Sequence, residues 1–131
     1  MKHLLLTLSL CFSALVWAHA STDSGEALDW LNTIDAGKYD ESWQNTDAFF
    51  KAQVTKAKWS DTLKGVRTPL GQVVSRSKIS SQHHTSLPGA PDGEYLVIQY
   101  QTEFQHKKAS TETLTLSKSS GQWRPVGYFI R

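Results

Sequence analysis

The spacing of apolar residues changes once along this chain, near Arg67, and that change constrains the fold more than any other feature. Before it, apolar residues recur at intervals of three and four, the spacing of one face of an α-helix. After it, they alternate with polar residues, as in a strand with one buried face. Helices followed by strands are typical of an α+β domain, in which helices pack on one face of an antiparallel sheet.

About three helical segments are predicted in the first half. The first spans residues 24–37 and ends at Gly37, where a left-handed residue is typical. A short turn over residues 39–45 has Asp40 as its expected cap. A longer helix is predicted to begin at Thr46 or Asp47 and to end at Gly65. The apolar stripe of the first helix consists of Ala27, Leu28, Trp30, Leu31 and Ile34.

The second half predicts a curved four-stranded antiparallel sheet. Residues 67–71, with a proline and a glycine, are expected to be a connector. Alternation places one set of side chains of the second strand on the buried face. Pro125 cannot donate to a strand ladder, so its strand is expected at an edge or with a bulge there. The inward-facing set consists of Leu96, Ile98, Tyr100 and Phe104.

The first twenty residues predict a secretory signal peptide. Lys2 precedes an almost wholly apolar run over residues 4–17, and Ala-His-Ala then fits a small-x-small cleavage site. The run is shorter than the roughly 20 residues that a membrane-spanning helix needs. We therefore expect residues 1–20 to be removed. The product would be a single α+β domain over residues 21–131, periplasmic or secreted, with no stable membrane insertion.

Composition excludes several classes of protein. Cys11, the single cysteine, lies in the predicted signal peptide, so the product would have neither disulfides nor a thiol nucleophile. Without Lys2 the chain carries 13 basic and 12 acidic residues, mixed along its length. Nucleic-acid-binding domains are usually much more basic. We therefore expect no nucleic-acid partner, and nothing in the composition indicates a cofactor.

Four stretches carry a family resemblance: "WLNTIDAGKYDESW", "KWSDTLKGVRTPLGQVVSR", "LPGAPDGEYLVIQYQTEF" and "GQWRPVGYFIR". They closely resemble the bacterial exported family called domain of unknown function 4019, across residues 27–131. Pro125 departs from this pattern, where valine or another strand former is expected. The resemblance implies export and the helix-then-strand order, but no activity and no catalytic residues. The architecture is also similar to cystatin-like and nuclear transport factor 2-like folds, which host enzymes, binding modules and assembly domains.

The reactive side chains form no recognisable catalytic or metal-binding motif. His83 and His84 are adjacent in a predicted strand, so their rings point to opposite faces and not toward one ion. The serines lack a G-x-S-x-G motif. Glu103 and Glu112 can face each other across a hairpin and perturb each other's pKa. The two lysines between them instead favour a solvated hairpin tip. We expect no metal site, and we expect that the chain is not an enzyme.

The loop "LPGAPDG", residues 87–93, has two interpretations. Prolines and glycines in this pattern are typical of a tight turn before a strand. Rigid loops on a sheet are also common places for recognition. The sequence favours the first interpretation, because Asp92 is the only reactive group in the loop.

A candidate ligand site is predicted where the helices meet the sheet. Aromatic walls with a few polar groups are typical of small-molecule pockets. Two guanidinium groups would favour a carboxylate or phosphate. Core packing is the favoured explanation of the tryptophans, and an exposed face is the alternative explanation of the arginines. The candidate ligand-binding residues are Trp43, Trp59, Arg67, Arg76 and Tyr100.

The preferred hypothesis for function is a non-enzymatic binding or accessory module of the bacterial envelope. It would bind an unknown protein or small ligand through its sheet or loop end. The alternative is a small enzyme or small-ligand binder with a cone-shaped pocket between helices and sheet. Buried ionisable groups that converge in one cavity would favour the alternative.

Overall fold

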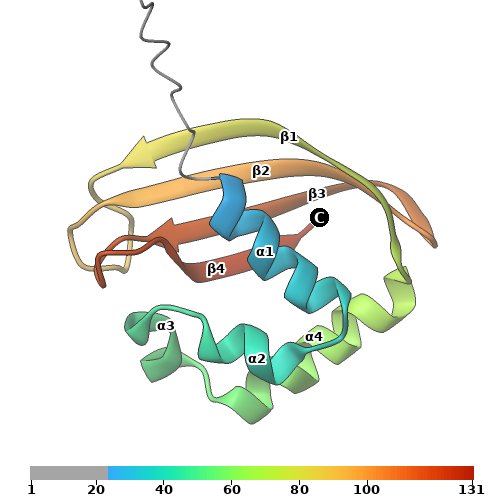
Figure 1. Cartoon of the computed structure of the whole chain (residues 1–131), viewed down its shortest axis with the longest axis horizontal. Coiled ribbons are helices and arrows are strands. Elements are labelled where there is room, and N and C mark those ends of the chain that lie inside the picture. Colours follow the sequence, from blue (N-terminus) through green and yellow to red (C-terminus); the bar gives the residue numbers. More distant parts are fainter. Residues whose placement is uncertain (1–23) are drawn as a thin grey trace, which may run out of the picture.

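The computed structural model describes residues 24–131, so the predicted signal peptide lies outside the described residues. The helices come first in the chain and lie together on one side of a curved antiparallel sheet (Figure 1). The predicted α+β class and the order of helices and strands are confirmed. The described elements are α1 (Ser24–Asp35), α2 (Tyr39–Gln44), α3 (Ala48–Gln53), α4 (Lys56–Leu70), β1 (Val73–His84), β2 (Tyr95–Phe104), β3 (Lys107–Ser117) and β4 (Arg124–Ile130).

Helix α1 packs through four of the five residues of its predicted stripe, and Gly37 follows its end as predicted. Gly37 has a φ of 76°, and its N–H donates to the carbonyl of Ile34 at 2.9 Å. Leu28 is the exception, because it lies at the margin of the stripe and is 39% exposed. The buried residues are Ala27, Trp30, Leu31 and Ile34.

The long helix predicted over residues 46–65 is wrong, because the chain forms two helices there. Asp47 caps α3 as predicted, and its side chain accepts from the N–H of Phe49. Val54 then adopts an extended conformation, and its carbonyl accepts a hydrogen bond of 2.8 Å from the indole of Trp43. Thr55 caps the next helix, α4, through its side chain. The break therefore follows from a tertiary contact and a new cap.

The predicted end of the second helix at Gly65 and the connector over residues 67–71 are also wrong. Helix α4 continues through Pro69 to Leu70 and ends at Gly71, which has a φ of 76°. The extra turn carries Arg67 toward the sheet, which positions the site described below. The cap predicted at Asp40 is wrong too, since Asp40 lies inside α2 and accepts a hydrogen bond from Ser60 in α4.

The four strands form a simple antiparallel meander in the order β1-β2-β3-β4. The pairing of β3 with β4 shifts register between Thr115 and Leu116, where Pro125 lies opposite Leu116. Pro125 is therefore both on an edge strand and at a bulge, as predicted. The N–H of Asp47 donates to the carbonyl of Pro125 at 2.8 Å, which joins the start of α3 to this edge.

The core lies between the helices and the inner face of the sheet. The inward-facing set predicted for β2 is buried, and Leu114 and Leu116 of β3 extend the same surface. The ring of Trp30 lies 6.1 Å from that of Trp59 and 5.5 Å from that of Tyr128. Large aromatic side chains thus fill a core that contains no disulfide among the described residues.

Candidate functional site

Ionisable side chains from both layers meet between the helices and the sheet. We call this cluster the ionic network, and it consists of Asp35 at the end of α1, Arg67 in α4, Arg76 in β1 and Glu112 in β3. Strand alternation places Arg76 and Glu112 on the inner face, and the last turns of α4 and α1 supply the other two. The network therefore connects four elements that are far apart in the sequence.

Arg76 binds two carboxylates at once. Its Nε and Nη2 donate to Glu112 at 2.6 and 3.1 Å, and its Nη1 and Nη2 donate to Asp35 at 2.8 and 3.1 Å. Both contacts are bidentate, the geometry in which a guanidinium group binds a carboxylate most strongly. Four of the five N–H donors of this guanidinium are therefore occupied by partners within the chain.

Arg67, unlike Arg76, contacts one carboxylate and one aromatic ring. Its Nη2 donates to Asp35 at 2.9 Å, and its guanidinium carbon lies 5.1 Å from the centre of the Phe104 ring. The Arg67 side chain is only 5% exposed, whereas that of Asp35 is 23% exposed. The Nε and Nη1 atoms of Arg67 are buried without a hydrogen-bond partner. Arg67 thus keeps two donors that its neighbours do not use.

Glu112 is a charged group with no exposed surface. In addition to Arg76, it accepts hydrogen bonds from the hydroxyl groups of Thr102 and Tyr128. A buried carboxylate is tolerated only when charges and donors replace its hydration. Here one guanidinium and two hydroxyl groups do so.

The network also changes the proton affinity of its members. Burial raises the pKa of Tyr128 well above its ordinary value, and the charge and hydrogen bond of Glu112 raise it further, against the opposing charges of Arg67 and Arg76. Burial alone would lower the pKa of Arg76, but hydrogen bonds and charge from Asp35 and Glu112 raise it above its ordinary value. Arg76 is therefore charged and Tyr128 neutral at physiological pH.

Among the five predicted ligand-binding residues, the structure brings Arg67 and Arg76 together on one carboxylate. Both are buried, so the interpretation of an exposed face is wrong for them. Tyr100 is buried on the inner face of β2, opposite Glu112. Trp43 and Trp59 lie in the helical layer.

The two tryptophans use their indole N–H groups within the protein. The indole of Trp43 donates to the carbonyl of Val54, and that of Trp59 donates to the hydroxyl of Ser42 at 2.9 Å. Trp59 is part of the core, where its ring lies 5.1 Å from that of Phe50. A ligand-binding role for the five residues remains a prediction.

Sequence reasoning missed the carboxylates that hold the arginines. The pairing of Glu103 with Glu112 is wrong, because Glu103 lies opposite Ser75 of β1 while Glu112 lies opposite Tyr100. The solvated hairpin tip is therefore wrong for Glu112. The sequence did indicate that Glu112 faces inward, because it lies two residues before the apolar Leu114 and therefore on the same face of the strand. Asp35 had no such signal.

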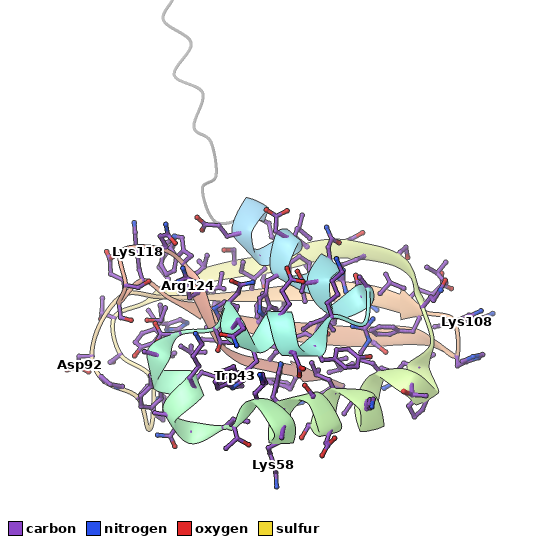
Figure 2. The ribbon with its side chains drawn as sticks, turned by 60° about the horizontal axis from the view of Figure 1, so that its bottom comes forward. Trp43, Lys58, Asp92, Lys108, Lys118 and Arg124 are labelled. Atoms are coloured by element: carbon purple, nitrogen blue, oxygen red, sulfur yellow. The ribbon has the colours of Figure 1, made fainter. Side chains whose placement is uncertain are left out.

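A surface hollow lies at the other end of the sheet, and we call it the loop-end hollow. It has a volume of about 410 Å³ and is formed by the β1–β2 loop, the start of α3, the β3–β4 connection and Val126 of β4. Figure 2 shows Asp92 and Lys118 at this end of the molecule and Lys108 at the opposite end. The residues around the hollow are Asp47, Ala48, Phe49, Pro91, Asp92, Gly93, Glu94, Tyr95, Ser117, Lys118, Ser119 and Val126.

The "LPGAPDG" loop is held in one shape by contacts across it. Gly89 has a φ of 78°, the left-handed conformation that glycine adopts most readily. The N–H of Gly93 donates to Thr85 at 3.0 Å, and the hydroxyl of Tyr95 donates to the carbonyl of Pro91. The loop is thus the ordered turn that the sequence favours, and it also forms one wall of the hollow.

The carboxylates around the hollow differ in whether they have partners within the protein. The carboxylate of Asp47 accepts from the N–H of Phe49 at 2.9 Å and from the hydroxyl of Ser119 at 2.6 Å. Asp92 and Glu94 are exposed, and neither forms an ion pair within the described part of the chain. The hollow therefore carries two carboxylates that are open to a ligand.

The described residues show neither a metal-binding cluster nor a membrane-spanning helix. Between Ser24 and Arg131, no group of three His, Cys, Asp or Glu side chains is placed to hold a metal ion. The ring of His83 lies 6.0 Å from that of Trp123, at the surface of the sheet. In the same part of the chain, no helix has the length and apolar character that crossing a membrane requires.

Comparison with known proteins gives a family but no function. The family model described as "Protein of unknown function (DUF4019)" matches residues 26–128. The chain belongs to this family. The DUF4019 match thus covers all of the helical layer except the start of α1, and almost all of the sheet. No curated protein matches the chain. The DUF4019 assignment confirms the predicted resemblance, and the description of the family names no activity.

Proposed function

We propose that this chain is an exported, non-enzymatic binding module of the bacterial envelope, and that it engages its partner through the loop end. The observation that carries the proposal is the loop-end hollow. Three chain segments and β4 enclose it, and two carboxylates beside it have no partner in the described chain. Ordered loops on a rigid sheet are common positions for binding sites.

The ionic network brings buried ionisable groups together, which is the feature expected of the alternative, but the bonds within it favour the non-enzymatic proposal. Acid-base catalysis needs a group that can exchange a proton with a substrate near the working pH. Arg76 and Glu112 are bound to each other, and the raised pKa of Tyr128 keeps its proton out of reach at neutral pH. The network instead joins α1 and α4 to the sheet, which is a structural role.

Export is supported by the sequence of residues 1–20. Its basic start, apolar run and Ala-His-Ala site have the three-part pattern of a secretory signal peptide. A periplasmic or secreted location follows from this pattern.

Site-specific photo-crosslinking tests which surface engages a partner. The photoreactive amino acid p-benzoylphenylalanine replaces Lys118 at the loop end or Lys108 at the opposite end (Figure 2). Both lysines are exposed, which makes the two positions a matched pair. We expect specific adducts in envelope extracts from position 118 and none from position 108. Adducts from position 108 alone, or from neither, would contradict the proposal.

A second candidate function, binding of a small anion between the layers, is favoured by one observation. Arg67 has two buried donors, Nε and Nη1, without a partner, and anions bind guanidinium groups through such donors. Titration with inorganic phosphate, followed by tryptophan fluorescence, tests this function. We expect a saturable change that is lost in Arg67→Ala. Equal binding by this variant would exclude Arg67.

A further inference from the structure

We infer that the loop-end hollow binds a peptide segment in which an apolar side chain is followed by basic residues. This inference rests on the proposed function and adds the chemical class of the partner. It uses three features of the hollow, which are its apolar walls, its acidic margin and its fixed shape.

The walls of the hollow are largely apolar. Phe49 and Val126 are half-buried, and Pro91 and Ala48 add further carbon surface. A volume of about 410 Å³ lies within the range of roughly 300–1,000 Å³ that is typical of small-ligand sites. An apolar side chain that enters such a space is removed from water, which favours binding in proportion to the buried area.

The margin of the hollow is acidic. Asp92 and Glu94 are exposed on the loop side, and Asp47 also lines the hollow. Lys118 is the one basic residue around the hollow, and its ammonium group lies 5.5 Å from the ring centre of Trp123. The margin thus has an excess of negative charge and would attract a cationic segment.

The hollow is already shaped before a ligand arrives. The N–H of Lys118 donates to the carbonyl of Glu94 at 3.1 Å, which ties the β3–β4 connection to the β1–β2 loop. The contact between Tyr95 and Pro91 fixes the loop, and the hydrogen bond from Ser119 to Asp47 fixes the start of α3. Such preorganisation lowers the entropy lost on binding.

Titration of the purified protein with short peptides tests the ligand class. The probe is acetyl-Leu-Lys-Lys-amide, followed by two-dimensional NMR of the backbone amides. We expect shifts at Ala48, Asp92, Gly93 and Ser119 and none at Lys108. Acetyl-Ala-Lys-Lys-amide should bind more weakly because its side chain fills less of the hollow. Acetyl-Leu-Glu-Glu-amide should not bind, because its charges repel the margin.

Two pairs of variants distinguish the contribution of the acidic margin to binding from that of the hollow itself. Asp92→Asn with Glu94→Gln should weaken the probe about threefold to tenfold, as expected for exposed charge pairs, and added salt should reduce the difference. The matched control, Glu41→Gln with Asp61→Asn, removes two exposed carboxylates of the helical layer and should change nothing. Ala48→Trp should fill the hollow and abolish binding, whereas Ala52→Trp on the same helix should not.

Each result decides either the ligand class or the wider proposal. Equal binding of the leucine and alanine peptides, or of the lysine and glutamate peptides, would overturn the ligand class. Absence of shifts at the hollow would overturn it as well. If crosslinking from position 118 still succeeds, the loop end remains the binding surface for a partner of different chemistry. If crosslinking fails too, the proposed function falls with the inference.

Discussion

Glu112 keeps its charge in the interior because three side chains replace the water that it loses on folding. Arg76 supplies the opposite charge, and Thr102 and Tyr128 supply hydroxyl donors. Breaking one side of a buried ion pair is much more costly than removing the pair, because the remaining charge is left uncompensated. We therefore expect single substitutions in the ionic network to lower the free energy of unfolding strongly.

We predict that Glu112→Gln lowers the free energy of unfolding by about 3–5 kcal/mol, the range for breaking a buried ion pair. The substitution keeps the shape but leaves Arg76 without one of its two carboxylates. Urea unfolding followed by tryptophan fluorescence measures the change. The control Glu103→Gln, which lies opposite Ser75 in the sheet, should stay within about 0.5 kcal/mol of the parent. Similar losses of stability in both variants would contradict the conclusion that Glu112 belongs to a buried ion pair.

The pKa of Tyr128 gives a prediction about alkaline pH. Its pKa is raised in the folded state, first by burial and then by Glu112, relative to an ordinary value of about 10. Above about pH 10 the phenol ionises in the unfolded chain but not in the folded one, so the free energy of unfolding falls as pH rises. At lower pH the contribution is fully present.

The comparison between the parent and Tyr128→Phe isolates this effect, because the other tyrosines are common to both. We expect the parent to lose more stability than the variant between pH 8 and pH 10.5, measured as the shift in urea midpoint. Equal losses would show that the phenol has no raised pKa.

At the scale of elements, the ends of the helices decide where the charged groups lie. Helix α4 runs past Gly65 to Leu70, which places Arg67 against the sheet. It ends at Gly71, where a Cβ atom would lie 2.8 Å from the Cβ of Gln105. Gly71 therefore has two reasons to be glycine, a positive φ and a close approach to the β2–β3 turn.

We predict opposite effects for two glycine substitutions in the same region. Gly71→Ala should destabilise the protein by about 1–3 kcal/mol, the range for backbone strain at a positive φ. Gly65→Ala should stabilise it by about 0.5–1 kcal/mol, because Gly65 is inside a helix and has open space around its Cα. Thermal unfolding measures both. A destabilising Gly65→Ala would indicate that the helix ends there.

At the scale of the whole molecule, the two ends of the sheet differ in structure. Near the β2–β3 hairpin, the ionic network holds the helices to the sheet. At the opposite end, loops surround an open hollow with an acidic margin. The separation would allow the proposed binding at one end without disturbing the charges that stabilise the other.

The proposed export also concerns the whole chain, and it gives the last prediction. We expect the protein recovered from the periplasm or medium to begin at Ser21, as measured by intact mass, because residues 1–20 have a signal-peptide pattern. Ala18→Arg, which puts a large residue in the cleavage site, should prevent the processing. A product that retains residues 1–20, or one with a lipid on Cys11, would contradict this.

Patterns along the chain were sufficient for the order of elements and for the faces of the strands. The change of period near Arg67 predicted helices before strands, and alternation placed Ile98 and Tyr100 inward. Gly37 and Asp47 marked helix ends correctly. These features depend on the local geometry of the backbone, which repeats every 3.6 residues in a helix and every two in a strand. A single sequence contains that information.

The ionic network and the loop-end hollow depend on contacts between distant segments. Arg76 meets Glu112 because β1, β2 and β3 pair in one register, and a one-residue shift would turn a side chain to the other face. The break before Thr55 depends on the indole of Trp43, eleven positions before the carbonyl it binds at Val54. No local propensity encodes such pairings, because burial and tertiary hydrogen bonds outweigh the few tenths of a kcal/mol that separate backbone preferences.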